Sequence, residues 1–330
     1  MSMQLALKVD VDTYQGTRFG VPRLVEMLKA ARARATFLFS LGPDHTGRAI
    51  KRVFRRGFLQ KVSRTSVVSH YGLKTLLYGT VLPGPDIGRA CSAVLRSVKD
   101  EGFETGIHTW DHIAWQDGVA RAPAAWTERQ MNLAVQRFIE IFEEAPTVHG
   151  AAGWQMNRHA VRMTQRLAFR CASDCRGQRP FIPVWDGELV LCPQLPTTLP
   201  TLDELIGVDG VTEETAAEVI LSRTRDAQSA QDGDPAQHAQ VFTLHAELEG
   251  MKLAPVFARL LEGWRDQGCE LVDLGTAVAR LNIAHLPRHT IQYGSVPGRS
   301  GTLLVQGEEF LAGSPPALAG ADALNPLLSP

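Results

Sequence analysis

The sequence predicts an α/β protein in which parallel strands are joined by helices. Short apolar runs that are typical of buried strands alternate with longer segments whose apolar residues recur at helical spacing. In addition, residues that can carry chemistry follow directly after two of the strand-like runs, which is where α/β enzymes place their active sites. These two observations favour a sheet built from parallel β/α units.

The pattern places the elements in order along the chain. Strands are expected at residues 5–13, 35–39, 103–107, 148–150, 170–173 and 240–244. Helices are expected at residues 22–34, 87–100, 127–144, 157–168 and 253–266. In the third helix, Thr127 is expected to cap the N-terminus, and Pro146 is expected to stop the helix beyond its last turn.

The composition is that of one globular domain. Although 330 residues can make two domains, α/β barrels of this length are commonly single, and 44% hydrophobic residues suffice for a large core. The five cysteines form no C-x-x-C pair, which argues for a reducing compartment and against a disulfide framework or a cysteine zinc site. We find no signal peptide and no apolar run long enough to span a bilayer, so we expect a protein that is soluble or lies on a membrane surface.

We expect the domain to cover residues 1–285 and a weakly ordered tail to cover residues 286–330. From about Pro287 onward the sequence turns to Gly, Pro, Ala and Leu with little periodicity, as in the stretch 312–317. We expect no catalytic role for this tail.

Two histidines four residues apart, His108 and His112, are the first candidate metal ligands. If the segment winds helically, both side chains lie on one face and can bind one cation. The residues before them read as the end of a strand. The competing interpretation is two core or surface histidines at helical spacing, and the glutamate of a metalloprotease helix is absent. A metal site therefore needs a carboxylate from elsewhere.

The first strand ends in two such carboxylates, Asp10 and Asp12. In an extended chain, residues two apart point the same way, and like charges side by side are unfavourable without a cation or a shared proton. A helix cap is the competing interpretation for one of them but does not account for both. One carboxylate and two imidazoles leave positions open for water and substrate, as in a catalytic metal site. The residues alone do not say which aspartate is the ligand.

These two motifs resemble those of the polysaccharide deacetylase (NodB-homology) family. The resemblance rests on Lys-Val-Asp-Val-Asp-Thr at residues 8–13 and His-Thr-Trp-Asp-His at residues 108–112, and it covers about residues 5–275. Further runs are similar to one branch, the 4-deoxy-4-formamido-L-arabinose-phosphoundecaprenol deformylases of the aminoarabinose pathway that modifies lipid A. These runs lie at 20–24, 151–154, 173–177 and 243–247. The resemblance implies a distorted, incomplete (β/α) barrel.

The resemblance also implies a divalent metal ion held by Asp12, His108 and His112, with Asp10 as the general base. A metal in this position would lower the pKa of a bound water and polarise the formyl oxygen of a substrate. One carboxylate and two imidazoles suit Zn, Mn, Co, Ni or Fe, so the identity of the metal stays open.

Three further residues are expected to complete the site. His245, at the end of a late strand, is the expected general acid, because a histidine can protonate an amine leaving group near pH 7. Asp174 is expected to orient His245, and Arg176 is expected to pair with Asp10. An ordinary surface ion pair between Asp174 and Arg176 is the competing interpretation.

The chain departs from the wider family at residues 151–154. Sugar deacetylases carry an Arg-x-Pro-Tyr-like motif there, whereas this chain has Ala-Ala-Gly-Trp, and the missing arginine is the reason for expecting Arg176 beside the base. The small-residue loop indicates a different acyl and sugar pocket, consistent with formyl rather than acetyl. Trp110, Trp115 and Trp154 are candidates for stacking on the sugar, and buried core tryptophans are the competing interpretation.

Residues 45–85 read as a basic amphipathic insertion after the second strand. Eight Lys and Arg residues and no acidic residue lie between Asp44 and Asp86, interspersed with large apolar residues. Such a stretch suits an anionic membrane surface beside the site, where a lipid-linked substrate needs an apolar, basic rim. A solvated helix over the core is the competing interpretation. Nucleic acid is disfavoured, because the net charge of the chain is only −1 and no nucleic-acid fold signature is present.

Three hypotheses follow for the function. The leading one is a metal-dependent deformylase of a lipid-linked amino sugar, bound peripherally to the cytoplasmic face of the bacterial inner membrane, that contributes to lipid A modification and polymyxin resistance. The second is an N-deacetylase of another sugar or of peptidoglycan, against which the absent secretion signal and the basic stretch count. The third is an inactive metal-binding module at a membrane, in which Asp10 and His245 would have no reason to occur together.

Overall fold

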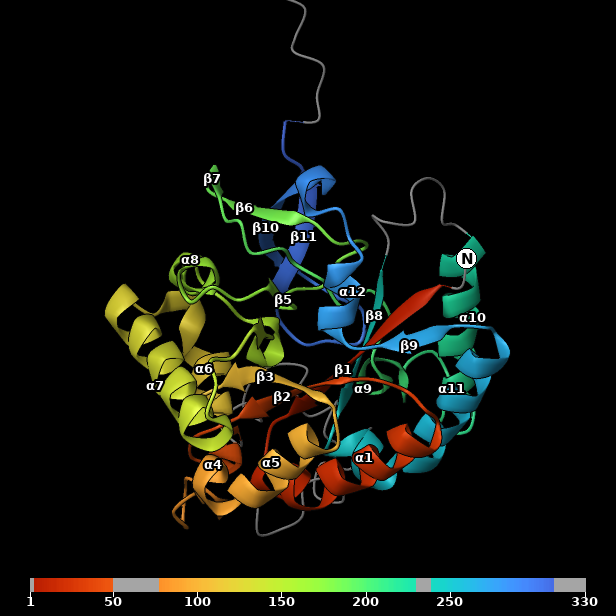
Figure 1. Ribbon diagram of the computed structural model, residues 1–330, viewed down its shortest axis with the longest axis horizontal. Helices are drawn as coiled ribbons and strands as arrows, with labels where there is room; N and C mark the ends of the chain where they lie inside the picture. The colour runs from red at the N-terminus through yellow and green to blue at the C-terminus, as the bar shows by residue number, and fades with distance from the viewer. Residues whose placement is uncertain (1–2, 50–76, 230–238, 312–330) are drawn as a thin grey trace, which may run out of the picture.

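The computed structural model describes residues 3–49, 77–229 and 239–311. In this part of the chain the main sheet runs in the order β5-β4-β3-β2-β1-β8, and β9 pairs with the start of β1 (Figure 1). The strands pair in parallel and are joined by helices on the outside of the sheet. The sheet curls without closing between β5 and β8, which confirms the predicted distorted, incomplete (β/α) barrel.

The strands of the main sheet are β1 (Gln4–Val11), β2 (Thr36–Ser40), β3 (Glu104–Thr109), β4 (Val148–His149), β5 (Cys171–Ala172), β8 (Gln240–His245) and β9 (Glu270–Val272). Each of the six predicted strands is confirmed to within two residues. β1 lies between β2 and β8, and its residues from Leu5 onward are buried. Parallel strands covered on both faces read as continuous apolar runs, and that is why they stand out in the sequence.

The predicted helices correspond to α1 (Val21–Ala30), α4 (Ile87–Ala90) with α5 (Ser92–Asp100), α7 (Ala124–Phe142), α8 (Arg158–Arg166) and α11 (Ala254–Asp266). The second is broken at Cys91, which lies between α4 and α5. Thr127 is not the N-cap of α7, because the helix begins after Pro123 and the Thr127 hydroxyl donates to the Pro123 carbonyl. Further helices are α6 (His112–Gly118), α9 (Leu202–Leu205), α10 (Ala216–Ser229) and α12 (Leu274–Ala279).

A second sheet corrects the prediction for the C-terminal segment. It comprises β6 (Ile182–Trp185), β7 (Glu188–Leu189), β10 (Arg288–Gly294) and β11 (Leu303–Glu309), in the order β11-β10-β6-β7. The prediction of a weakly ordered tail from residue 286 is therefore wrong over residues 288–309, and residues 312–330 lie outside the described part. The order comes from non-local contacts: β10 pairs with β6, and Ile291, Leu303 and Leu304 are buried.

The hairpin formed by β10 and β11 braces the loops that follow β4 and β5. The backbone N–H of Arg176 donates to the Leu304 carbonyl, and the Arg176 carbonyl accepts from Gln306. Between the two strands, Arg299 makes ion pairs with Glu204 and Asp203. The hairpin is thus part of the domain and packs directly on the segments that lead into the site.

Most of the basic insertion at 45–85 lies outside the described residues, so its predicted amphipathic character stays a prediction. Of its eight basic residues only Arg48 is described, and its guanidinium donates to the Gly79 carbonyl. Within the described ranges, no helix combines the length and the apolar character that crossing a bilayer requires.

Replacing Arg299 by Met is expected to lower the free energy of unfolding by about 2 kcal/mol, because a largely buried ion pair loses one partner. The matched control is Arg280→Met. Arg280 pairs with Glu270, and each of these two side chains is 42% exposed, so the free energy of unfolding should fall by less than about 1 kcal/mol. Urea unfolding of both variants measures the difference. Equal losses would contradict the bracing role of the hairpin.

Candidate metal centre and active site

The predicted site residues gather at the carboxyl ends of the parallel strands. Asp10 lies in β1 with Asp12 directly after it, His108 lies near the end of β3, and His245 ends β8. In the pairing of β1 with β8, Asp10 lies opposite His245. Because the carboxyl ends of parallel strands meet at one edge of a sheet, residues far apart in the sequence become neighbours there.

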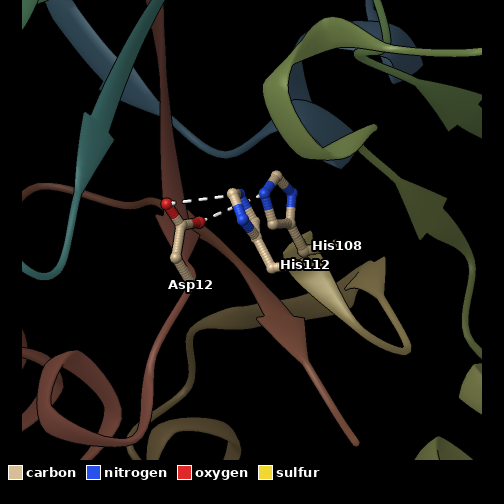
Figure 2. Close-up of side chains that lie close together, drawn as sticks. All are labelled: Asp12, His108 and His112. Carbon is tan, nitrogen blue, oxygen red and sulfur yellow. Dashed lines mark ion pairs between the residues drawn. The ribbon is translucent and has the colours of Figure 1, made fainter. Parts of the chain in front are cut away.

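Asp12, His108 and His112 form a compact cluster (Figure 2). One ligand atom from each side chain lies within 4.8 Å of the others. His108 Nε2 is 3.2 Å from Asp12 Oδ1, and His112 Nε2 is 3.4 Å from Asp12 Oδ2. Donor atoms spaced in this way can share one cation, with bonds of about 2.0–2.2 Å for a metal such as zinc.

The two histidines reach Asp12 from a strand and a helix, not from one helical face. His108 lies in β3, and His112 is the first residue of α6. The chain turns between them, and Asp111 caps α6 by accepting a hydrogen bond from the Ala114 N–H. The helical spacing noted in the sequence is therefore a strand-to-helix turn.

The tautomer of His108 suits a metal ligand. Its Nδ1 lies 2.7 Å from the Gly150 carbonyl, so Nδ1 is the donor and Nε2 presents its lone pair to Asp12. The facing atom, Asp12 Oδ1, is buried and finds no hydrogen-bond donor among the described residues. A buried carboxylate oxygen opposite an imidazole lone pair calls for a cation, and these three residues fit a divalent metal ion.

The charges in the cluster shift the pKa values in opposite directions. Burial acts to raise the pKa of Asp12, but the neighbouring His112 and His108 hold it well below its usual range. Burial acts to lower the pKa of His108, and the carboxylates of Asp10 and Asp12 outweigh it, so the pKa of His108 is raised. Protons therefore compete with a cation for His108 as the pH falls.

Asp10 has a different partner from the one predicted. Its Oδ2 lies 3.2 Å from the ammonium of Lys8, whereas the guanidinium of Arg176 forms an ion pair with Glu204. The predicted pairing of Arg176 with Asp10 is not found, because Glu204 and the carbonyls of Thr197 and Leu199 hold the guanidinium elsewhere. Asp10 Oδ1 is buried and has no hydrogen-bond partner among the described residues.

Asp174 also has other partners than the predicted one. Its carboxylate contacts His149 Nδ1 at 2.7 Å and accepts from the Ala151 N–H, so it orders the loop after β4 instead of orienting His245. The carboxylate nearest the backbone of His245 is Glu249, which accepts from the His245 N–H at 2.7 Å. Burial raises the pKa of Glu249 to about 7. His245 Nδ1 has no hydrogen-bond partner in the described part of the protein.

The three tryptophans differ in exposure. Trp115 and Trp154 are 1% and 2% exposed, and their ring N–H groups donate to the Gln155 carbonyl and to Thr197 Oγ1. Both are core residues in this structure and present no face to a sugar. Trp110 is partly buried, and the guanidinium of Arg137 lies 5.1 Å from its ring centroid.

Glu247 supports the site and was not recognised in the sequence. Its Oε1 accepts from the N–H groups of Asp12 and Thr13 and from the Thr13 hydroxyl, so it fixes the loop that carries Asp12. The contact requires glycine at position 16, where a Cβ would lie 1.9 Å from that same oxygen. The run 243–247 marked the family resemblance, but an acidic residue after a strand does not by itself reveal a backbone contact 235 residues away.

The arrangement has the parts that amide hydrolysis requires. A cation site of Asp12, His108 and His112 is adjacent to Asp10, whose free oxygen can accept a proton. On the neighbouring strand, His245 supplies an imidazole that can donate one. A side chain that can accept a proton and one that can donate a proton thus lie on two adjacent strands of one sheet.

Two curated relatives cover most of the chain. Both carry the name "Probable 4-deoxy-4-formamido-L-arabinose-phosphoundecaprenol deformylase ArnD". The protein from Shewanella sediminis (strain HAW-EB3) is 35% identical over 272 residues, which span 82% of this chain and 84% of the relative. The protein from Wigglesworthia glossinidia brevipalpis is 30% identical over 293 residues, 88% of this chain and 98% of the relative. A scan against protein-family models gave no match.

Solved structures share the fold at low sequence identity. A candidate polysaccharide deacetylase from Mycobacterium smegmatis superposes with a TM-score of 0.60 at 14% identity, over 89% of this chain and 95% of the other. A probable polysaccharide deacetylase from Pseudomonas aeruginosa PAO1 gives a TM-score of 0.56 at 13% identity, over 86% and 92% of the two chains. The chain therefore has the fold of the polysaccharide deacetylases, and it belongs to the family of 4-deoxy-4-formamido-L-arabinose-phosphoundecaprenol deformylases.

Proposed function

We propose that this protein hydrolyses the formamide of 4-deoxy-4-formamido-L-arabinose linked to undecaprenyl phosphate, releasing formate and the free amino sugar lipid. The observation that carries the proposal is the cluster of Asp12, His108 and His112 with Asp10 and His245 beside it, in a chain whose curated relatives bear the name of this activity. Such a site suits the hydrolysis of a linear amide bond.

A divalent metal ion, of which Zn, Mn, Co, Ni and Fe all suit one carboxylate and two imidazoles, would lower the pKa of water at the site and polarise the formyl oxygen. Asp12 faces both imidazoles and would hold the ion with them. Asp10, tied to Lys8 through Oδ2, keeps Oδ1 to accept the proton of the attacking water. Water adds to the formyl carbon as that proton leaves.

His245 completes the reaction. Its imidazole donates a proton to the departing nitrogen, the carbon–nitrogen bond breaks, and the products are formate and the amine. The position of His245 opposite Asp10 puts the acid and the base within one substrate's reach. Trp110, which is partly buried, is the proposed sugar contact.

The lipid-linked substrate places the reaction at a membrane. We propose that residues 45–85, with eight basic residues and no acidic one, bind the anionic cytoplasmic face of the bacterial inner membrane beside the site. The proposed product would serve lipid A modification, which reduces the attraction of the outer surface for polymyxin and other cationic peptides.

Formate release tests this function. The purified protein, incubated with formamido-arabinose undecaprenyl phosphate, should release formate, and acetylated sugars should release little or no acetate.

A chelator should abolish the activity, and added divalent metal should restore it. His108→Ala should lose both metal and activity, because one of the three ligands is gone. Acetate release without formate release would instead indicate a deacetylase, and full metal content in His108→Ala would contradict the ligand assignment.

Two substitutions test the acid and the base. Asp10→Asn and His245→Ala should each keep the metal but lower kcat by roughly two to four orders of magnitude, which is the usual contribution of a general acid or base. Metal analysis and steady-state kinetics of the same preparations measure both properties. Near-normal turnover of Asp10→Asn would place the base elsewhere, and loss of metal in this variant would reverse the roles of Asp10 and Asp12.

Glu249 should make the stability of the metal-free protein depend on pH. Its pKa is raised from 4.5 to about 7 in the folded protein, so the unfolded chain loses this proton first as the pH rises. Stability should therefore fall between about pH 4.5 and 7, by roughly 3 kcal/mol from this group. Glu249→Gln, which keeps the oxygen that accepts from the His245 N–H, should abolish this part of the slope.

Urea unfolding at several pH values between 4.5 and 8 measures the slope. The matched control is Glu262→Gln on the exposed face of α11, which should leave the wild-type pH dependence unchanged. A Glu249→Gln profile parallel to that of the wild type would contradict the account of Glu249 as a buried acid.

A further inference from the structure

Lys8 is a fully buried lysine in the central strand, two residues before Asp10. Its side chain has no solvent exposure, and its ammonium lies 3.2 Å from Asp10 Oδ2. The same ammonium donates a hydrogen bond of 3.1 Å to the Ser173 carbonyl. Lysine is almost never fully buried unless it is paired, because removing its charge from water is costly. Its burial beside the site therefore calls for an explanation.

We propose that Lys8 is the positioning residue of the general base: it fixes the carboxylate of Asp10 so that Oδ1 alone is presented to the attacking water. This inference rests on the proposed function of Asp10. In place of Arg176, the residue expected beside the base, the inference names Lys8, which lies on the same strand as Asp10. Lys8 is fully buried and is not one of the three candidate metal ligands.

The two oxygens of Asp10 have different surroundings. Oδ2 is engaged by the Lys8 ammonium, whereas Oδ1 is buried without a hydrogen-bond partner in the described part of the chain. Oδ1 lies 3.8 Å from His108 Nδ1, the ring nitrogen that donates to the Gly150 carbonyl. Residues two apart in a strand project from the same face, so the β1 backbone itself brings ammonium and carboxylate together. The ion pair thus engages Oδ2 and leaves Oδ1 as the free oxygen of Asp10, next to the imidazole of His108.

Lys8 is held in place by the loops after β4 and β5. The Ser173 carbonyl accepts from the ammonium, and the Trp154 ring centroid lies 5.3 Å from Nζ. Gly150 leaves the space: a Cβ there would lie 3.0 Å from Lys8 Cε and 2.3 Å from Leu38 Cδ1. The Gly150 carbonyl also accepts from His108 Nδ1, so one segment positions both the base's partner and a proposed metal ligand.

The two other cationic side chains near Trp154 form ion pairs with a different carboxylate. The guanidinium groups of Arg176 and Arg299 stack on the same ring at 5.3 and 4.6 Å, but both pair with Glu204. Among these three cations only Lys8 makes an ion pair with Asp10. Arg299→Met therefore changes the surroundings of Trp154 without touching the base, and it serves as the matched control.

A double-mutant cycle in kcat tests the inference. Lys8→Met, which replaces the apolar stem of the side chain but removes the ammonium, should lower kcat by roughly 100-fold, as a misplaced catalytic group does. KM should change by less than about twofold, because the Lys8 side chain is fully buried. In the Asp10→Asn background, Lys8→Met should change kcat by less than about threefold, since its partner is already disabled. Arg299→Met should keep kcat near the wild-type value despite its lower stability.

Losses that multiply in the Lys8→Met/Asp10→Asn double mutant would overturn the inference, because Lys8 would then act independently of Asp10. Wild-type kcat in Lys8→Met would overturn it as well. The wild-type assay separates this failure from that of the proposed function: absent formate release refutes the function before any variant is compared.

A second cycle, in thermal stability of the metal-free protein, needs no substrate. Lys8→Met leaves the Asp10 carboxylate buried without its cation and should lower Tm markedly, whereas Lys8→Met in the Asp10→Asn background should lower it far less. If Lys8→Met does not fold alone but folds together with Asp10→Asn, the coupling is supported in its strongest form. Equal Tm losses in both backgrounds would overturn the pairing itself.

Discussion

Burying the carboxylates of Asp10 and Asp12 at the end of β1 costs free energy that the surrounding residues have to offset. Asp10 is 3% exposed and is paired with a lysine that has no exposure at all. Asp12 faces two imidazoles, and one of its oxygens finds no hydrogen-bond donor among the described residues. The first carboxylate is thus neutralised by the chain itself, while the second calls for a metal ion. This difference supports the proposal that Asp10 is the base and Asp12 a metal ligand.

The rest of the fold keeps these charges in place. Glu247 holds the loop after β1 through the backbone of Asp12 and Thr13, and Asp174 holds the loop after β4 through His149 and Ala151. The hairpin of β10 and β11 then packs on the segment around Arg176. The segment 288–309, for which the sequence predicted weak order, therefore packs on the loop that follows β5. Positioning by such surrounding contacts is what keeps catalytic groups in productive geometry.

Local patterns in the sequence were sufficient to predict the parallel β/α units and the candidate ligands, and the family resemblance added the incomplete barrel and the choice of Asp12 over Asp10. Buried parallel strands give apolar runs, and Asp12, His108 and His112 each follow or end such a run. The partners of Asp10 and Asp174 were not predictable in this way, since they depend on side chains from different strands and loops. Arg176, in the loop after β5, forms an ion pair with Glu204 of α9, 28 residues later in the chain. No local pattern in the sequence indicates this contact. Lys8, in contrast, was visible as a charge within an apolar strand, yet its pairing needed the structure.

Anomalous diffraction from crystals grown with a divalent metal such as Mn²⁺ or Zn²⁺ tests the central claim most directly. The account predicts one strong peak within about 2.0–2.3 Å of a carboxylate oxygen of Asp12 and of the Nε2 atoms of His108 and His112. Asp10 should lie outside bonding distance and remain paired with Lys8. A peak bound by Asp10, or a metal held elsewhere with the cluster of Asp12, His108 and His112 empty, would contradict it.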